Sequence, residues 1–198
     1  MKSTFRSISS QRGSSLIEVL VTLVILMLGL LGLVGLMVQS QRSQMESYQR
    51  MQALVVLQDM VNRINTNRKA AACYALPDPV GTGYAVPATG TLAVTSTCPV
   101  VTAEQIAWAQ RTDQDIREWN NLLLGSTEKS GTRDVGAMLG ARGCITAVSA
   151  GVYQVSVVWQ GGGATIAPPV AVTCGFELYG DEALRRAVSV PLEIANLS

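Results

Sequence analysis

The longest apolar run of the chain lies near its beginning and predicts a membrane-spanning helix. From Val19 to Val38 this run is interrupted only by Thr22 and three glycines, and the sequence becomes polar at Gln39. As a helix, a run of this length extends about 30 Å, roughly the hydrocarbon thickness of a bilayer. A cleaved secretory signal is disfavoured, because its apolar core is shorter and small residues mark its cleavage site.

The helix is expected to continue past this run as an amphipathic segment. Residues 39–68 contain neither proline nor glycine. Their apolar positions recur every three or four residues: Met45, Tyr48, Met51, Leu54, Val55, Val61 and Ile64. Acid-before-base pairs, Glu46 with Arg50 and Asp59 with Arg63, also favour a helix. We expect one helix from Ser15 to Arg68, roughly 80 Å long, whose outer half packs one stripe on a globular head.

The rest of the chain predicts an α+β head that contains an antiparallel sheet. A helix is expected over Thr102–Leu124, with Thr102 as its cap and with Ile106, Ala109, Ile116, Trp119 and Leu123 on one face. Residues rich in Val, Ile, Tyr and Trp, separated by turn residues, predict an antiparallel meander. Its strands are expected at Cys144–Val148, Tyr153–Gln160, Val170–Phe176 and Ala187–Ile194, with a further short strand near Thr91–Thr95. Pro191 indicates that the last strand lies at an edge or carries a bulge.

The charged residues in and before the apolar run indicate its orientation in the membrane. The residues before Ser14 include Lys2, Arg6 and Arg12 and no acid, so the positive-inside rule keeps them cytoplasmic and sends the rest of the chain outward. One carboxylate, Glu18, stands at the start of the apolar segment. A charge deep in a bilayer costs on the order of 2.5–3.5 kcal/mol. Glu18 therefore needs a compensating partner.

The residues from Arg12 to Val19, read as Arg-Gly-Ser-Ser-Leu-Ile-Glu-Val, resemble the processing site of type IV prepilins with a class III leader. The resemblance implies that prepilin peptidase cuts between Gly13 and Ser14 and methylates the new amino terminus of Ser14. It also implies that Glu18 pairs with an amino terminus, its own or a neighbour's, and so sets the register of assembly. Ser14 departs from the bulky apolar residue usual there, which bears on methylation more than on cleavage.

Further segments resemble the PilV group of minor pilins: Gln52-Ala53, Asp59-Met60, the stretch from Arg63 to Arg68, Gly143-Cys144-Ile145 and Arg185–Val188. The resemblance implies the type IV pilin fold, in which a long N-terminal helix packs on an antiparallel sheet. It divides the chain into a leader (1–13), a transmembrane and assembly segment (14–38), an amphipathic half-helix (39–68) and a head (69–198).

A PilV-like minor pilin is stored in the inner membrane by a single pass, with its head in the periplasm, and then joins the pilus at the cell surface. The implied partners are prepilin peptidase, the major pilin, other minor pilins, the inner-membrane assembly machinery and membrane lipid. The implied roles are pilus assembly, adhesion and twitching motility. Two alternatives stay open: a pseudopilin of a type II secretion system and a membrane-anchored periplasmic binding module.

The cysteines fit an exported head. Cys73, Cys98, Cys144 and Cys174 all follow the apolar run, and four cysteines allow three disulfide pairings. Disulfides are expected in an oxidising periplasm, and pairing of sequence neighbours, Cys73 with Cys98 and Cys144 with Cys174, is favoured. The chain contains no histidine and no C-x-x-C pair, so a zinc site is not expected, and neither is another metal or cofactor.

Enzymatic activity is not expected. Without histidine, the usual Ser-His-Asp and Cys-His arrangements are excluded. Asp113, Asp115 and Glu118 are interpreted as a solvated helix face, and Asp181 and Glu182 as a turn with local ion pairs to the following arginines. The three tryptophans, Trp108, Trp119 and Trp159, are interpreted as core residues. Removal of the leader's three basic residues changes the formal net charge from +1 to −2, so no nucleic-acid partner is expected.

Overall fold

The computed structural model describes residues 15–84, 98 and 102–195. The chain divides into two compact units, Met1–Gln44 and Met45–Ser198, and each is described by itself. Helix α1 (Leu16–Thr66) contributes to both units. It begins and ends within two residues of the bounds expected from the sequence, and it is followed by a 3₁₀ helix, η1 (Arg68–Tyr74).

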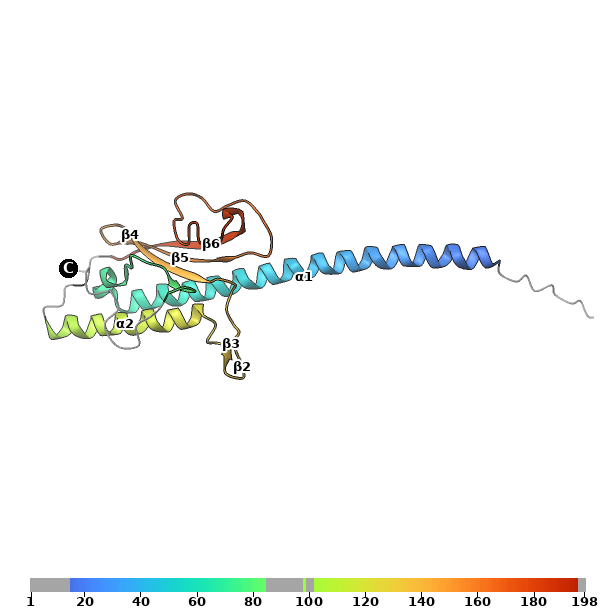
Figure 1. Ribbon diagram of the computed structural model, residues 1–198. Helices are drawn as coiled ribbons and strands as arrows, with labels where there is room; N and C mark the ends of the chain where they lie inside the picture. Colours follow the sequence, from blue (N-terminus) through green and yellow to red (C-terminus); the bar gives the residue numbers. More distant parts are fainter. Residues whose placement is uncertain (1–14, 85–97, 99–101, 196–198) are drawn as a thin grey trace, which may run out of the picture. The chain divides into compact units, whose positions relative to one another are not determined.

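The second unit is built on a four-stranded antiparallel sheet (Figure 1). Its strands are β1 (Val80–Gly81), β4 (Arg142–Ser149), β5 (Val152–Gln160) and β6 (Arg185–Glu193), in the order β1-β4-β5-β6. The predicted meander is confirmed for β4, β5 and β6. Pro191 lies on β6 opposite Gln154, and β6 is an edge strand, as the proline indicated.

One predicted strand, Val170–Phe176, is wrong, because this segment forms turns in the structure. The backbone carbonyls of Val172 and Cys174 accept hydrogen bonds from the guanidinium of Arg185, at 2.7 and 2.9 Å, instead of pairing with a neighbouring strand. Gly175 has a positive φ of 66°, a conformation outside the β region. The segment expected near Thr91–Thr95 lies outside the described residues.

The second helix is confirmed, and several short elements were not predicted. Helix α2 (Ala103–Leu123) begins with a capping box, in which Thr102 and Gln105 exchange hydrogen bonds between side chain and backbone. After α2 the chain forms a hairpin of two short strands, β2 (Lys129–Ser130) and β3 (Arg133–Asp134). Strand β1 was not foreseen either, and it pairs with the beginning of β4. A short 3₁₀ helix, η3 (Glu182–Leu184), precedes β6.

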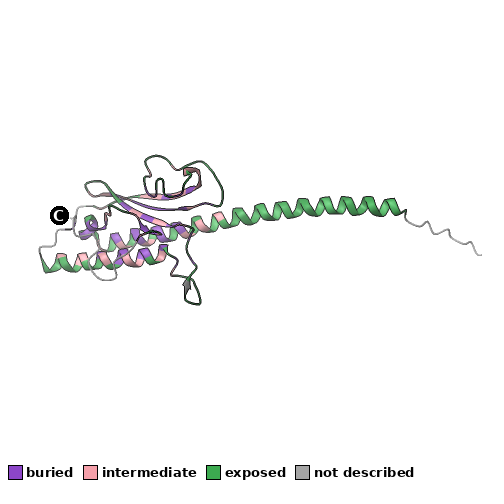
Figure 2. Ribbon diagram, viewed as in Figure 1, coloured by how far each residue is buried: buried purple, intermediate pink, exposed green. Residues whose placement is uncertain are grey.

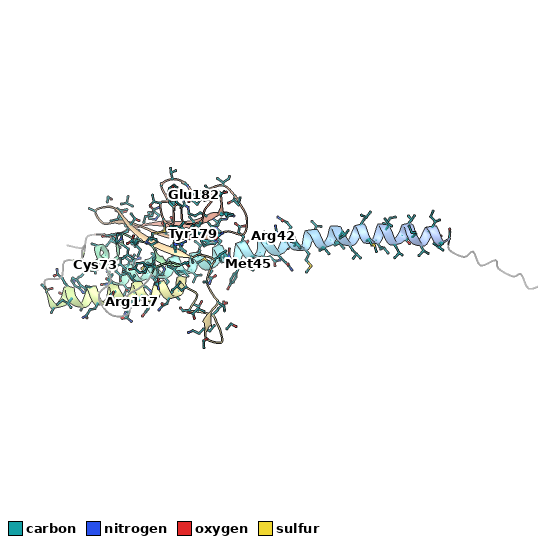
Figure 3. The ribbon with its side chains drawn as sticks, viewed as in Figure 1. Arg42, Met45, Cys73, Arg117, Tyr179 and Glu182 are labelled. Carbon is teal, nitrogen blue, oxygen red and sulfur yellow. A yellow bond between two sulfur atoms is a disulfide. The ribbon has the colours of Figure 1, made fainter. Side chains whose placement is uncertain are left out.

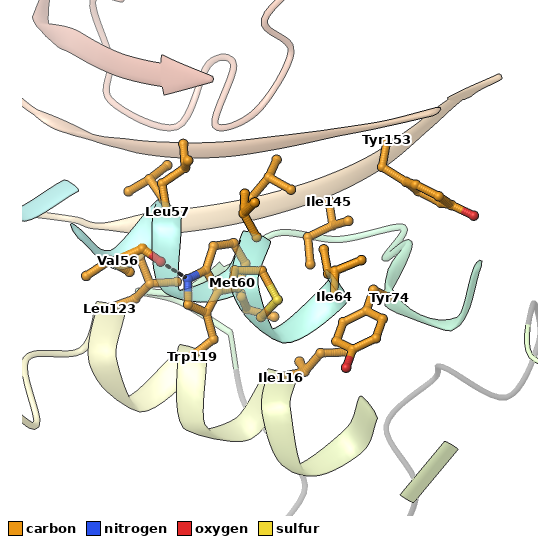
Figure 4. Packing of buried hydrophobic residues seen from close by; sticks show 14 of the residues in the cluster. Val56, Leu57, Met60, Ile64, Tyr74, Ile116, Trp119, Leu123, Ile145 and Tyr153 are labelled. Carbon is orange, nitrogen blue, oxygen red and sulfur yellow. Dashed lines mark hydrogen bonds between the residues drawn. The ribbon is translucent and has the colours of Figure 1, made fainter. Parts of the chain in front are cut away.

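The core lies where α2 and the outer part of α1 pack on one face of the sheet (Figure 4). Trp119 of α2 is completely buried at its centre. Its indole N–H donates a hydrogen bond of 2.9 Å to the carbonyl of Val56 in α1. Trp159 of β5 is also buried, whereas Trp108 is half-buried. The interpretation of tryptophans as core residues is confirmed for Trp119 and Trp159.

The opposite face of the sheet carries a smaller cluster, because side chains alternate between faces along a strand. Val158, Cys174 and Tyr179 form it, and Figure 3 labels Tyr179 in the segment that covers this face. The Tyr179 hydroxyl donates to the carbonyl of Gly140 at 2.7 Å. Two disulfides fasten the unit: Cys73 is joined to Cys98, and Cys144 to Cys174.

Two ion pairs involve the arginines at the start of β6. Arg185 pairs with Glu182 at 2.6 Å, as expected for a local turn. Arg186 instead pairs with Glu46 of α1 at 2.5 Å, so the edge strand is attached to the helix. The sequence had placed Glu46 with Arg50; among the residues described here, the ion pair of Glu46 is with Arg186.

Candidate functional site

The apolar segment of α1 exposes its side chains on every side. All residues of the first unit described here, from Ser15 to Gln44, are exposed (Figure 2). The large apolar side chains between Leu16 and Val38 range from 83% to 43% exposed. By length and composition this helix is able to cross a membrane. Contiguous apolar surface on this scale marks contact with lipid or with other helices.

The first turn of α1 contains Glu18. The Ser15 carbonyl accepts the backbone N–H of Glu18 at 2.9 Å and that of Val19 at 3.3 Å. The positive end of the helix dipole lies at this turn and favours a carboxylate there. The expected cleavage and methylation residues, Gly13 and Ser14, lie outside the described residues. The structure therefore places Glu18 within one helical turn of the start of the helix.

The remaining polar and small residues of the apolar segment suit a membrane helix. The Thr22 hydroxyl donates to the Val19 carbonyl at 2.9 Å, so its polar group is satisfied within the helix, as hydrocarbon surroundings require. A Cβ added at Gly29, Gly32 or Gly35 would meet no atom of the chain within 4 Å. Small residues of this kind let a second helix approach closely.

The outer part of α1 carries two apolar faces, where the sequence indicated one. The face packed on the head consists of Ala53, Val56, Leu57, Met60, Val61 and Ile64. Val61 and Ile64 were predicted to belong to it. Met45, Tyr48, Met51, Leu54 and Val55 were predicted to pack as well, but they are 45–70% exposed. The spacing of apolar positions did not separate the two faces, and only the structure shows which positions the head covers.

The acidic group on α2 is not a uniformly solvated face, so that interpretation was wrong for one of its members. Asp115 is 1% exposed. Its carboxylate accepts a hydrogen bond from the Tyr74 hydroxyl at 2.5 Å. It also lies 3.1 Å from Arg63 Nη1 and 3.1 Å from Arg111 Nε. These contacts join α1, η1 and α2 around one buried charge.

We call this set, Asp115 with Arg63, Arg111, Tyr74 and Glu118, the Asp115 network. Arg63 also pairs with Asp59 at 2.6 Å and with Glu118 at 2.5 Å, and the first of these is the i,i+4 pair expected from the sequence. A buried carboxylate whose acceptor positions are filled by fixed donors suits a structural brace better than proton transfer. Within the described ranges, no group of acidic or cysteine side chains could hold a metal ion.

Glu118 and Tyr74 are members of the network whose pKa values are shifted. The hydrogen bond from Arg63 lowers the pKa of Glu118 below its usual value, and a second hydrogen bond from Gln114 acts in the same direction. Burial raises the pKa of the Tyr74 hydroxyl above its ordinary 10.0, and the hydrogen bond to the Asp115 carboxylate raises it further. The folded state therefore favours an ionised Glu118 and a neutral Tyr74.

These shifts predict a loss of stability at both ends of the pH range. Because the pKa of Glu118 is lower in the folded state, its contribution is present above the unfolded value of 4.5 and is lost as pH falls below it. Because the pKa of Tyr74 is higher in the folded state, its contribution is present below pH 10.0 and is lost as pH rises above it. Free energies of unfolding measured against pH for the wild type, Glu118→Gln and Tyr74→Phe test both directions.

The difference in unfolding free energy between wild type and each variant reports on the one titratable group that the variant lacks. The difference between wild type and Tyr74→Phe should be constant below pH 10.0 and should shrink above it. The difference for Glu118→Gln should shrink below pH 4.5. Differences that stay constant across these ranges would contradict the assignment.

Comparison with known proteins adds one finding at the beginning of the chain. Residues 8–34 match a family described as the prokaryotic N-terminal methylation motif. The match includes Gly13, Ser14 and Glu18. A search of curated proteins found no match, and a search of solved structures found none.

The matched motif supports a place in the type IV pilin and pseudopilin family. It implies processing by prepilin peptidase and use by a pilus or secretion machinery. The long N-terminal helix and the antiparallel sheet of four strands are consistent with the pilin fold. The motif, together with the apolar helix, fits a protein anchored by a single membrane pass.

Proposed function

We propose that this chain is a PilV-like minor pilin that joins type IV pili and helps to prime their assembly, and so supports adhesion and twitching motility. In this proposal residues 1–13 are the leader, 14–38 the membrane and assembly segment, 39–68 the amphipathic half of the helix, and 69–198 the head. The protein waits in the inner membrane with its head in the periplasm and then enters the filament at the cell surface.

The observation that carries the proposal is the methylation motif at residues 8–34, placed directly on a helix whose apolar side chains are exposed on every side. A protein that only needs an anchor gains nothing from a carboxylate in that helix, because the charge opposes insertion. Glu18 in the first turn of α1 is useful if an ammonium group pairs with it. Cleavage between Gly13 and Ser14 creates such an ammonium group at Ser14.

Assembly follows from the properties of this helix. In the bilayer, lipid covers the apolar side chains of the segment from Leu16 to Val38. When the protein leaves the membrane, other pilin helices must replace the lipid, because the segment has no cover of its own within the residues described. Pairing of Glu18 with the amino terminus of a neighbouring pilin then removes the cost of burying the carboxylate and fixes the axial position of the incoming subunit.

A pseudopilin of a type II secretion system is the second candidate. The same methylation motif supports it, because such proteins share the leader and the helix. The two candidates differ in the filament that contains the protein. Recovery of the mature chain in pili sheared from the cell surface supports the minor pilin.

The amino terminus of the protein in its own membranes tests the proposal. Mass spectrometry should find a chain that begins at Ser14, methylated on its amino group, in cells with prepilin peptidase. In cells without the peptidase the chain should still begin at Met1. A chain that begins at Met1 in both strains would overturn the proposal and leave a membrane-anchored binding module.

A second test concerns assembly. Replacing Glu18 by alanine should leave cleavage intact but reduce the amount of protein in sheared filaments by at least tenfold, which corresponds to about 1.4 kcal/mol of lost pairing energy. Quantitative immunoblotting of filaments and membranes provides the measurement. Thr22→Ala is a matched control one turn further along the same helix, since the Thr22 hydroxyl bonds only to its own helix in the described contacts. Equal incorporation of the Glu18→Ala protein and wild type would contradict the role of Glu18.

A further inference from the structure

A groove on the second unit lies between α1 and the end of α2 together with the segment that follows it. Its volume is about 460 Å³. The Gln52 amide donates a hydrogen bond to the carbonyl of Gly136, which holds the far wall of the groove against α1. Residues from both walls line the groove: Tyr48, Met51 and Val55 of α1, and Leu122, Thr127 and Glu128.

The α1 wall of the groove is apolar although it faces solvent. Tyr48, Met51 and Val55 are spaced three and four residues apart, so they share one face of the helix. They are 53%, 67% and 70% exposed. The opposite face of α1, with Val56 and Met60, is the one buried against the head. A surface helix normally presents polar residues to solvent, so this apolar wall requires a partner.

The rim of the groove is negatively charged. The Glu128 carboxylate accepts a hydrogen bond from the Tyr48 hydroxyl at 3.2 Å. Glu128 takes part in none of the ion pairs found in the described ranges, whereas its neighbour Lys129 pairs with Asp134 at 3.6 Å. The carboxylate raises the pKa of the Tyr48 hydroxyl through this hydrogen bond. A segment that combines an apolar side chain with a positive charge would complement both the wall and the rim.

This chain carries such a segment on its own helix. Between Ser15 and Gln44 the sequence has two charged residues, Glu18 and Arg42. Arg42 is exposed (Figure 3), and Met45 follows it three residues later with 61% of its surface exposed. Residues three apart lie on the same face of a helix. Arg42 and Met45 therefore present a positive charge and an apolar side chain together.

We propose that the groove receives the turn of α1 that carries Arg42 and Met45 from a second copy of this chain. Arg42 of the second copy pairs with Glu128, and Met45 packs on Met51 and Val55. This inference rests on the proposed function in one respect: both copies cross the same membrane in the same direction, so their helices are parallel. Arg42 then lies level with Tyr48, which offsets the two copies by six residues of helix, or about 9 Å.

An offset of this kind has a consequence for assembly. The donor turn and the receiving groove are different surfaces of the chain, so the contact is heterologous, and each bound copy still offers a free groove or a free donor turn. A heterologous contact that does not close into a ring continues as an open stack. The groove would therefore guide parallel helices into a staggered arrangement rather than into a closed dimer.

The test is photo-crosslinking of the full-length protein in its own membranes, with benzoylphenylalanine in place of Met51. We expect a cross-linked dimer in which the attached peptide of the second copy spans Arg42 to Gln49. Glu128→Arg and Arg42→Glu should each lower the dimer yield about tenfold, in keeping with the coupling energies of close charge pairs across interfaces. The two reversals together should restore the yield, because the pair is then re-formed with opposite polarity.

Two further variants guard against misfolding. Glu128→Gln removes the charge but keeps the size and should lower the yield less than Glu128→Arg. Glu193→Arg is the matched control, since it reverses an exposed acidic residue on β6 that does not line the groove, and it should leave the yield unchanged. A dimer yield insensitive to both single reversals, no recovery in the double reversal, or cross-linking only to a different protein would each overturn the proposal.

The amino terminus, measured on the same membranes, separates this proposal from the proposed function. If the chain is processed to Ser14 but the charge reversals leave the dimer yield unchanged, the docking contact alone is overturned. A chain that begins at Met1 in the presence of the peptidase overturns the proposed function, whatever the cross-linking yields.

Discussion

Replacing Asp115 by alanine should lower the free energy of unfolding of the second unit by about 3 kcal/mol or more, within the range measured when a buried charge pair loses one partner. The Tyr74 hydroxyl would lose the carboxylate to which it donates at 2.5 Å. Its oxygen would still accept the hydrogen bond from the amide of Asn67. A buried donor left without an acceptor costs about 1–3 kcal/mol by itself.

The remaining loss of unfolding free energy comes from Arg63 and Arg111, which lose the Asp115 carboxylate as a partner. This contribution is small. Arg63 lies 3.1 Å from Asp115, but it keeps Asp59 and Glu118 as partners, so its charge stays compensated. Arg111 is half-exposed and can be solvated by water. The loss is therefore expected near the lower end of the range for broken buried pairs.

Urea unfolding of the full chain in detergent, followed by tryptophan fluorescence, measures this change. Asp113→Ala is the matched control on the same helix, because Asp113 also pairs with an arginine, Arg117 at 2.8 Å, but in a more exposed position. Such a pair is worth less than about 1 kcal/mol. Equal losses for Asp115→Ala and Asp113→Ala would show that the network does not brace α1 against α2.

The main elements of the fold could be predicted from the sequence, because they depend on local patterns. The apolar run from Val19 to Val38 and the absence of glycine and proline over residues 39–68 predicted α1 to within two residues. Segments rich in Val, Ile, Tyr and Trp, separated by turn residues, predicted β4, β5 and β6. Pro191 correctly indicated a strand at the edge of the sheet. Each of these signals lies within one element and does not depend on its neighbours.

The errors arose where a distant contact decides the outcome. Val170–Phe176 has the composition of a strand, but Arg185 uses its carbonyl groups. The position of Asp115 on α2 indicated a polar face, but Arg63 and Tyr74, more than 40 residues away along the chain, cover it. Contacts with the distant head likewise decide which of the two apolar faces of α1 is buried. Sequence periodicity identifies helix faces, but it does not show which face the fold covers.

The processing motif and the groove also differ in whether the sequence alone could identify them. The processing motif and Glu18 could be identified from sequence, because a peptidase site is a contiguous stretch. The groove could not, because its walls come from segments far apart: Tyr48 and Glu128, which share a hydrogen bond, are separated by 80 positions. A local clue existed in the exposed stripe of Tyr48, Met51 and Val55, but without the head the stripe has no second wall.

Gly143 of β4 should not tolerate a larger residue, and Gly143→Ala should destabilise the second unit by about 2 kcal/mol, as overpacking of a dense core does. A Cβ at this position would overlap the ring of Trp119. The ring has little freedom to move away, because Trp119 is completely buried and its indole N–H is bonded to the carbonyl of Val56 at 2.9 Å. Displacing the ring would leave the buried indole N–H without its acceptor.

The same urea unfolding experiment tests this prediction, with Gly162→Ala as the matched control, since a Cβ at Gly162 would meet no atom within 4 Å. Trp119→Leu is expected to be costly alone, because it removes a large buried ring and opens a cavity. In the double variant the new methyl group enters that cavity, so the combined loss should be smaller than the sum of the two single losses. Additive losses, or equal losses for Gly143→Ala and Gly162→Ala, would mean that close packing of Trp119 on β4 is not what requires glycine at this position.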